Sequence, residues 1–377
     1  MEINIKKRSF NYQQKQLDFA RLKMTRIIIQ IMKKFKLLFT AVFLLPLFSL
    51  AQDIHFSQLT ETPLLLNAAQ AGMSHNFLAI INYKDQWQHV SNTPYRTFNV
   101  AADMAFMKKS NGNHLGVGLN VFSDKAGDGG MGTTTGQLQL SGVLSMNDNN
   151  LISAGLSGGF GQRSLNYDKL QWDNQFVGGA YDATASSLEP ATFSNHTYTD
   201  FGAGIAWFYG KGHATLSSND AMTINAGLSI QHINKPAYSF YGNNDIRLPM
   251  KIVAHGNADI GIKNHNLILE PGYIVMLQGG HHEINAGVLC KYVMQDASHY
   301  TGRKKPAAFV LGAYYRFGDA VNLETAYEFS EYRIGFSYDI NLSDLNVASK
   351  SRGGFEISLH FMTPNPFGKG ATSKLFD

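Results

Sequence analysis

The sequence predicts an all-β protein, a single transmembrane antiparallel β-barrel of about fourteen strands in the outer membrane. Three observations support this prediction. Apolar and polar residues alternate one by one along many short segments, and a segment near the amino terminus has the features of a secretory leader. In addition, no apolar run after Ala51 is long enough to cross a bilayer as a helix.

Residues 32–51 have the three parts of a secretory signal peptide. Three lysines precede an apolar stretch, and a small-x-small cleavage site ends at Ala51, so the mature chain is expected to begin at Gln52. The apolar stretch is shorter than the roughly 20 residues of a membrane-spanning helix. Because a signal peptide normally starts at the first Met, we expect residues 1–31 to be a non-native upstream extension.

The charge of the chain is unevenly distributed. Residues 1–51 hold ten Lys and Arg and two acidic residues, whereas from residue 52 onward acidic residues outnumber basic ones by four. We therefore expect no nucleic-acid partner. The one cysteine, Cys290, cannot form an internal disulfide, and at an apolar strand position it is expected to act as a small hydrophobic side chain.

Alternation with a period of two defines the strands. In residues 332–342, YRIGFSYDINL, every second residue is apolar and those between are polar or small, which is typical of a strand with two unlike faces. About fourteen segments share this pattern. They lie near residues 76–84, 95–107, 114–123, 133–146, 150–165, 198–210, 221–232, 250–263, 266–278, 283–294, 307–318, 320–329, 331–342 and 353–362.

Turn-forming residues separate many of these segments. Examples are KSNGN at 109–113, NDNN at 147–150, KNHN at 263–266 and GDA at 318–320. No linker divides the mature chain, so we expect one barrel domain over residues 76–362. A periplasmic or lumenal segment, residues 52–75, is expected to precede it, and a tail, residues 363–377, to follow it.

The connections also favour an outer-membrane barrel, in which tight periplasmic turns alternate with longer surface loops. This alternation holds best up to about residue 266 and includes one long connection, residues 166–197. Pro271 weakens the prediction of the ninth strand, because proline cannot donate a hydrogen bond to a sheet.

The apolar faces are expected to contact lipid rather than a soluble core. They are rich in Tyr, Phe and Trp, which gather at membrane interfaces, while the polar faces carry Gly, Ser, Asn and Gln, as a wet or filled lumen would. Closure into a barrel also removes the sheet edges of an exported chain without disulfides. A soluble exported β-protein shows similar alternation; it would be excluded if the chain stays in the outer membrane after carbonate washing.

Two ends of the mature chain carry signature sequences. At the amino end these are QDIHFSQLTETPLLLNAAQAG (52–72), YKDQW (83–87) and YRTFNVAAD (95–103). The carboxyl end has YYRFGDAVNLETAYEFSEYRIGFSYDINLSDLNVASKSRGGFEISLHF (314–361), within which SYDINLSDL and GGFEISL are the most specific parts. Together they resemble the signatures of the PorP/SprF family. Ile54 and Ala68 stand where that family usually has proline, which affects the expected local turn geometry.

The resemblance implies an outer-membrane barrel associated with the type IX secretion machinery of Bacteroidota. Members of the family help particular secreted proteins, often large adhesins with a C-terminal sorting domain, to be exported and held at the cell surface, and some are required for gliding motility. The implied partners are outer-membrane lipid, type IX secretion components and a secreted client. The alternative is a general or selective porin, which would conduct ions and bind no stable protein partner.

Enzyme signatures are absent from the sequence. His281 and His282 followed by Glu283 could suggest a metal site, but neighbouring residues of a strand point to opposite faces, so a polar loop tip is expected. The run GDGGMGTTTG (127–136) lacks the Gly-Lys-Ser/Thr ending of a phosphate-binding loop. We expect a non-enzymatic protein without catalytic, cofactor or metal sites.

Seven charged residues occupy the polar strand faces and are expected to point into the lumen. They are Asp103, Asp259, Glu324, Glu328, Arg333, Asp339 and Glu356. They could form a structural network of paired carboxylates and cations, or they could line a selective channel or bind a transiting segment. Neutralising Glu324 or Asp339 separates these roles, because loss of folding supports the first and loss of export the second.

The segment 52–72 is the best candidate for an interaction. Phe56, Pro63, Asn67 and Gly72, with the leucines at 64–66, could fill the barrel as a plug or dock a periplasmic component. We expect that deleting residues 52–66 leaves a folded barrel but stops function.

Overall fold

The computed structural model describes residues 53–88, 93–109, 111–189, 195–211, 214–215, 218–219, 221–240, 246–296, 305–344 and 346–363. The chain divides into two compact units, residues 1–50 and 51–377, and only the second contains described residues. The predicted upstream extension, the signal peptide, its cleavage site at Ala51 and Gln52, and the tail beyond residue 363 lie outside the described residues.

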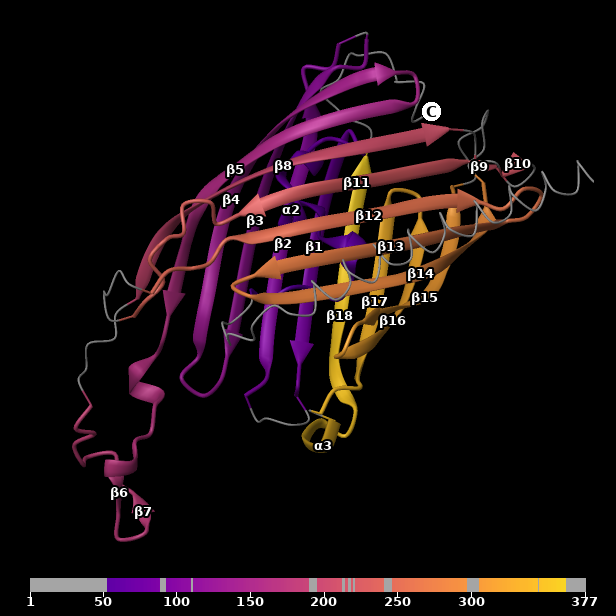
Figure 1. The fold of residues 1–377 in the computed structure, drawn as a ribbon. Coiled ribbons are helices and arrows are strands. Elements are labelled where there is room, and N and C mark those ends of the chain that lie inside the picture. The colour runs from indigo at the N-terminus through magenta and orange to yellow at the C-terminus, as the bar shows by residue number, and fades with distance from the viewer. Residues whose placement is uncertain are drawn as a thin grey trace, which may run out of the picture. The chain divides into compact units, whose positions relative to one another are not determined.

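Within the described residues, fourteen strands form one closed antiparallel barrel (Figure 1). They are β1 (Phe77–Gln86), β2 (Tyr95–Phe106), β3 (His114–Ala126), β4 (Met131–Asn147), β5 (Asn150–Ser164), β8 (His196–Lys211), β11 (Met222–Gln231), β12 (Lys251–Gly261), β13 (Leu267–Gln278), β14 (His281–Gln295), β15 (Ala307–Arg316), β16 (Ala320–Phe329), β17 (Tyr332–Asn341) and β18 (Arg352–Thr363). Each pairs with the next, and β18 pairs with β1 to close the cylinder. The predicted fold class is confirmed, and every predicted segment corresponds to one strand.

Short elements occupy the connections. They are the two-stranded hairpins β6 (Phe176–Val177) with β7 (Ala180–Tyr181) and β9 (Ala214–Thr215) with β10 (Ser218–Asn219), the 3-10 turns η3 (Tyr167–Lys169) and η4 (Asp173–Gln175), and the helix α3 (Asn346–Ser349). No helix in the described part of the chain has the length and apolar character needed to cross a membrane.

The two faces of each strand have the environments that the alternation predicts. On β17, Tyr332, Ile334 and Phe336 are 49%, 55% and 45% exposed on the outside, whereas Ser337 and Asp339 are 0% and 2% exposed inside. Apolar side chains therefore point outward along the wall and polar ones point inward. Such an apolar outer surface is typical of a barrel that faces lipid.

The barrel has two ends, which we call near and far. The near end is where β1 begins and β18 ends. Because successive strands run in opposite directions, the longest connections, residues 165–195 and 232–250, both lie at the far end. The far end also carries the tight turns 279–280 and 317–319, so long loops and short turns are only partly segregated between the two ends. Both residues of the first turn are glycines with positive φ, 57° and 91°, as a two-residue hairpin of this kind requires.

Pro271 does not prevent β13 from forming. It keeps its partner on β14, but on the β12 side the pairs jump from Asn257–Gly272 to Ile260–Leu269. The missing N–H of proline thus leaves a short gap in one ladder, while the strand itself continues.

The hydrophobic core lies inside the barrel, between the wall and the residues that precede β1. Three clusters of buried side chains form it, and each includes a contribution from that leading segment. Leu66 packs against the first cluster, Ala69 and Met73 belong to the second, and Leu64 and Ala71 belong to the third.

Candidate functional site

The lumen is occupied by residues 53–76, which we call the plug (Figure 1). It contains η1 (Leu59–Glu61), α2 (Pro63–Leu66) and η2 (Ala68–Gln70). Pro63 begins α2 at a position where its missing N–H breaks no helical hydrogen bond. Asn67 lies between α2 and η2, and its side chain caps η2 by accepting a 2.9 Å hydrogen bond from the N–H of Ala69.

The plug runs through the barrel from the far end to the near end. The N–H of Asp53 donates to Gln278, the last residue of β13 at the far end. At the other extreme, the N–H of Gly72 donates to Asp103 and its carbonyl lies 2.8 Å from a ring nitrogen of His114, near the ends of β2 and β3. The plug therefore contacts the wall over most of its height.

A cluster of charges holds the far end of the plug. Asp53 lies 2.7 Å from His232, whose other ring nitrogen lies 2.8 Å from Asp200, and Lys251 lies 3.8 Å from Asp53. Burial lowers the pKa of His232, but its hydrogen bonds to Asp200 and Asp53 outweigh burial and raise the pKa to about 9. Burial raises the pKa of Asp53, yet the contacts with His232 and Lys251 hold it well below its usual range. At neutral pH the His232 ring is thus an imidazolium between two carboxylates.

Two buried carboxylates in the far half of the wall hold the next part of the plug, at Ser57 and Gln58. The backbone N–H groups of Ser57 and Gln58 donate to the two oxygens of Glu356 at 2.6 and 2.9 Å. Lys84 lies 2.9 Å from the same carboxylate. Each oxygen of Glu356 thus has a partner that offsets the cost of its burial.

The second carboxylate belongs to Asp339. It accepts hydrogen bonds from the Ser57 hydroxyl at 2.7 Å, from Arg316 at 2.8 Å and from Asn322 at 2.7 Å. The plug and three neighbouring strands therefore meet at one buried carboxylate, which makes Asp339 a junction between them.

Side chains of alternating charge follow the near half of the lumen. In order, they are Glu270, Lys291, Glu328, Arg333, Glu61 and His360. Arg333 lies 2.5 Å from Glu328 and 3.0 Å from Glu61, which comes from the plug. Burial raises the pKa of Glu61, but the positive charges of Arg333 and His360 outweigh it and hold the pKa well below its usual range. A charged Glu61 therefore links the plug to the wall.

Plug and wall also lie close together at Asn67. Its amide donates to the carbonyl of Ile205 at 2.9 Å and lies 3.1 Å from a ring nitrogen of His255. Two wall positions beside it are glycines, because a Cβ on Gly155 would lie 2.5 Å from the plug backbone and one on Gly204 would lie 2.0 Å from the Asn67 side chain. These glycines allow η2 to lie directly against the strands.

The four plug residues named from the sequence all lie in the lumen. Phe56 is 3% exposed and meets Phe122 edge-on, with ring centroids 6.4 Å apart. Pro63 and Asn67 shape α2 and η2, and Gly72 has a φ of +61° in contact with the wall. The structure shows wall contacts for Phe56, Asn67 and Gly72, and a docking role for the four residues is a proposal.

The seven charges named from the sequence also face the lumen. Six of them have an ion-pair or hydrogen-bond partner; these are Asp103, Asp259, Glu328, Arg333, Asp339 and Glu356. The exception is Glu324, which is 6% exposed and whose Oε1 has no hydrogen-bond partner among the described residues.

Sequence analysis missed the basic partners of these carboxylates. Lys84, Lys291 and Arg316 lie within predicted strands and face the lumen, so the same period-two rule could have identified them. His232 follows the end of β11, and no local signal marks it. Its role depends on two carboxylates that are distant in sequence.

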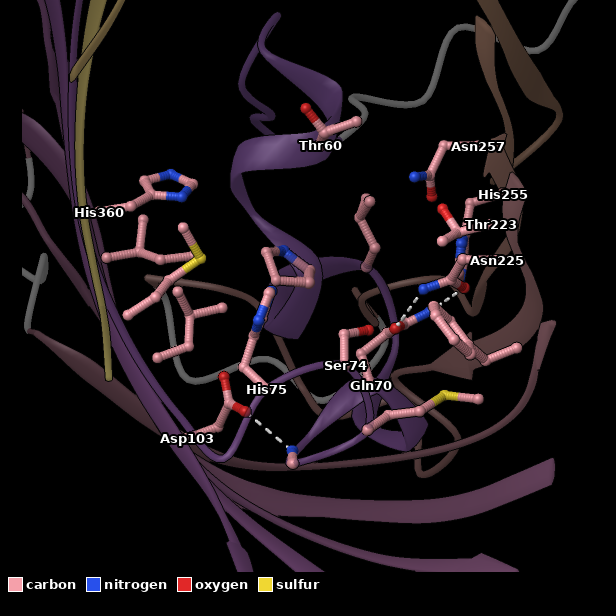
Figure 2. A pocket seen from close by; sticks show the side chains of 18 of the residues that line it. Thr60, Gln70, Ser74, His75, Asp103, Thr223, Asn225, His255, Asn257 and His360 are labelled. Atoms are coloured by element: carbon pink, nitrogen blue, oxygen red, sulfur yellow. Dashed lines mark hydrogen bonds between the residues drawn. The ribbon is translucent and has the colours of Figure 1, made fainter. Parts of the chain in front are cut away.

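A cavity of about 570 Å³ lies between the plug and the wall in the near half of the barrel (Figure 2). Gln70 of the plug and Asn225 of the wall exchange two hydrogen bonds at its edge, of 2.8 and 2.9 Å. His75 and Asp103 lie on the opposite side. Burial and the charge of His360 lower the pKa of His75 to about 4, so this ring is neutral at pH 7. No group of three or more His, Cys, Asp or Glu in the described ranges could hold a metal ion.

Comparison with known families gives one match to a family model. The model is described as "Type IX secretion system membrane protein PorP/SprF" and matches residues 48–361. No curated protein matches the chain.

Among solved structures, the chain is similar to several barrels of low sequence identity. The toluene transporter TbuX of Ralstonia pickettii has a TM-score of 0.45 and 12% identity, with 80% of this chain and 93% of that chain covered. BamA from Haemophilus ducreyi lacking POTRA domains 1–3 has a TM-score of 0.37 and 10% identity, over 76% and 71% of the two chains. CdiB from Escherichia coli has a TM-score of 0.40 and 9% identity, over 76% and 63%.

Proposed function

Since the chain belongs to the PorP/SprF family of type IX secretion system membrane proteins, we propose that it is a non-enzymatic barrel that supports secretion and the surface attachment of partner proteins such as large adhesins. The protein lies in the outer membrane, where its apolar outer face contacts lipid. The observation that carries the proposal is the family match, which spans all fourteen strands up to residue 361. A role in gliding motility belongs to the same proposal, through the adhesin that would be displayed.

The filled lumen supports an accessory role over an open porin. The plug contacts the wall at both ends and, through Asn67, in the middle, and Leu64, Asn67 and Ala69 are no more than 2% exposed. A segment held in this way leaves no wide aqueous path, whereas large porins keep an open channel.

The long far-end connection, residues 165–195, is the surface proposed to contact the secreted client. It exposes apolar side chains; Phe176 and Val177 of β6 and the later Leu188 are 52%, 61% and 78% exposed. In bacterial barrels the first strand begins and the last strand ends at the periplasmic side. The near end is therefore expected to face the periplasm and the far end to face the outside of the cell. This connection also holds four acidic residues and one lysine among those described, which suits a client surface with an apolar centre and basic surroundings.

Site-specific crosslinking in outer membranes tests the proposal. A photoreactive residue at Val177 is expected to capture a large surface protein with a C-terminal sorting domain. One at His265, in the near-end turn between β12 and β13, is expected to capture periplasmic components of the secretion machine. Mass spectrometry would identify both. Recovery of the barrel alone from both positions would contradict the proposal and favour the porin.

A further inference from the structure

The ladder between β12 and β13 has a gap of two residue pairs in its middle. Ala258 and Asp259 lie opposite Pro271 and Glu270 but form no pairs with them, although the register is the same on both sides of the gap. Proline has no N–H to donate, so this seam is held by fewer backbone hydrogen bonds than an unbroken ladder of equal length.

Two glycines adjoin the gap, and two tyrosines cover them. A Cβ on Gly256 would lie 2.6 Å from the ring of Tyr273, and a Cβ on Gly272 would lie 2.7 Å from the hydroxyl of Tyr314. Tyr273 is 47% exposed on the outer face, whereas Tyr314 is 1% exposed inside. The two glycines therefore leave the backbone at the seam without side chains. One aromatic ring covers it from outside the barrel, and another covers it from inside.

The near-end cavity lies directly behind this seam. Gly256, Gly272, Tyr273 and Tyr314 are all among its lining residues. Its volume of about 570 Å³ is in the range of small-molecule sites, roughly 300–1,000 Å³.

The lining of the cavity is amphipathic. Leu66, Ile80, Ile274 and Met362 contribute an apolar surface. Polar groups come from His75 and Asp103 on one side of the cavity and from Asn225 and Asn257 on the opposite side (Figure 2). A ligand that fits must therefore bring both an apolar part and a polar part.

Outside the seam there is lipid. The outward-facing neighbours Ile260, Leu269 and Tyr273 are apolar or aromatic and are 38%, 38% and 47% exposed. An opening at this point would connect the cavity to the acyl chains of the membrane, and not to water.

We propose that the seam at Pro271 is a lateral entry through which an acyl chain of an outer-membrane lipid reaches the near-end cavity. Outward rotation of the Tyr273 ring opens the path, and separation of β12 from β13 at the gap breaks few backbone hydrogen bonds because two pairs are already missing. The chain then lies against Ile80, Ile274 and Met362 and touches the plug at Leu66. This inference goes beyond the proposed function and needs only the barrel and the membrane.

Photo-crosslinking from the bilayer tests this entry. The full mature chain, carrying Cys290→Ser, is reconstituted in phosphatidylethanolamine vesicles that contain a phosphatidylethanolamine with a diazirine at the end of one acyl chain. After illumination, mass spectrometry is expected to find labels on the lumenal residues Ile80, Ile274 and Met362. Labels confined to outward residues such as Leu269 and Tyr273 would overturn the proposal.

A reversible disulfide lock across the seam distinguishes a loss of lipid entry from misfolding of the barrel. Ile260→Cys with Leu269→Cys keeps Pro271 and places two cysteines opposite each other at the edge of the gap, where a disulfide fits the strand spacing. Oxidation is expected to lower lumenal labelling several-fold, and reduction of the same sample is expected to restore it. The matched control is Ala313→Cys with Leu323→Cys, an opposite pair on β15 and β16, in which labelling should not depend on the redox state.

A second variant needs no disulfide. Pro271→Val supplies the missing N–H, so the ladder is expected to close and lumenal labelling to fall several-fold while the barrel becomes more resistant to urea. Labelling that stays unchanged in both the oxidised lock and Pro271→Val would exclude entry at this seam.

Discussion

Asp339 and Glu324 face the same lumen from neighbouring strands but have different surroundings. Asp339 accepts hydrogen bonds from Arg316, Ser57 and Asn322, whereas Oε1 of Glu324 has no hydrogen-bond partner in the described part of the chain. Removing one member of a buried ion pair leaves the other charge uncompensated, while neutralising a carboxylate without such partners removes a desolvation cost.

We therefore expect unequal effects from two conservative changes. Asp339→Asn should lower the free energy of unfolding by about 2–4 kcal/mol, and Glu324→Gln should change it by less than about 1 kcal/mol. Urea unfolding in lipid vesicles, followed by tryptophan fluorescence, measures both. If Asp339→Asn folds as stably as the wild type and yet blocks export, the charges act in transport and not as a structural network.

Two glycines of the wall provide a second matched pair. A Cβ on Gly155 would lie 2.5 Å from the plug backbone, whereas a Cβ on Gly142 would meet nothing within 4 Å. Gly155→Ala is expected to displace η2 from the wall and to make the plug sensitive to added protease, while Gly142→Ala should leave it protected. Equal protection in both variants would show that the plug can shift to accommodate a methyl group.

At the scale of elements, the plug is fastened by separate contacts along its length. The far-end cluster depends on a protonated His232, the segment at Ser57 and Gln58 depends on Glu356 and Asp339, and Asn67 fixes the turn between α2 and η2. Because these contacts involve different strands, loss of one is expected to loosen one part of the plug and leave the others bound.

The far-end cluster predicts a pH dependence. The pKa of His232 is about 9 in the folded protein, above its ordinary value of 6.5, so its stabilising contribution is complete below pH 6.5 and is lost as the pH rises through 9. This contribution is roughly 1–3 kcal/mol. A nitroxide at Ile54→Cys, in the Cys290→Ser background, should become mobile between pH 7 and pH 10. With His232→Gln, the label should be mobile at every pH; a label that stays rigid in that variant would contradict the role of His232.

Deletion of residues 52–66 tests whether the plug is needed for folding. The fourteen strands pair with one another through backbone hydrogen bonds that do not involve the plug, so the barrel is expected to form and to show the usual heat-dependent shift on gels. Export of the client is expected to stop. A product that fails to assemble would mean that the lumenal charges cannot be buried without their plug partners.

At the scale of the whole molecule, closure of the barrel and occupation of the lumen act together. Pairing of β1 with β18 leaves no free sheet edge in the barrel, and the plug fills the space that closure encloses. In planar bilayers the wild type is expected to conduct little current, and deletion of residues 52–66 should raise the conductance several-fold. High conductance by the wild type, without protein partners, would favour the porin.

The sequence by itself determined the strands and their two faces. Alternation at single-residue spacing is a local property, because successive side chains of a strand point to opposite sides, and it located every barrel strand, including β13 with its internal Pro271. The same rule placed the seven charges on the lumenal face. The resemblance of both chain ends to PorP/SprF likewise required no coordinates.

Only the tertiary structure decided what fills the lumen and how it is held. Ser57 and Glu356 are 299 positions apart, and Ser57 and Asp339 are 282 positions apart, yet both pairs are in contact. The sequence of either strand alone does not show why Gly155 and Gly204 are glycines. They could mark flexible positions, or they could form the surface on which Asn67 rests. Local spacing fixes which way a side chain points, but the partner it meets depends on the closure of the barrel, which brings distant strands around one segment.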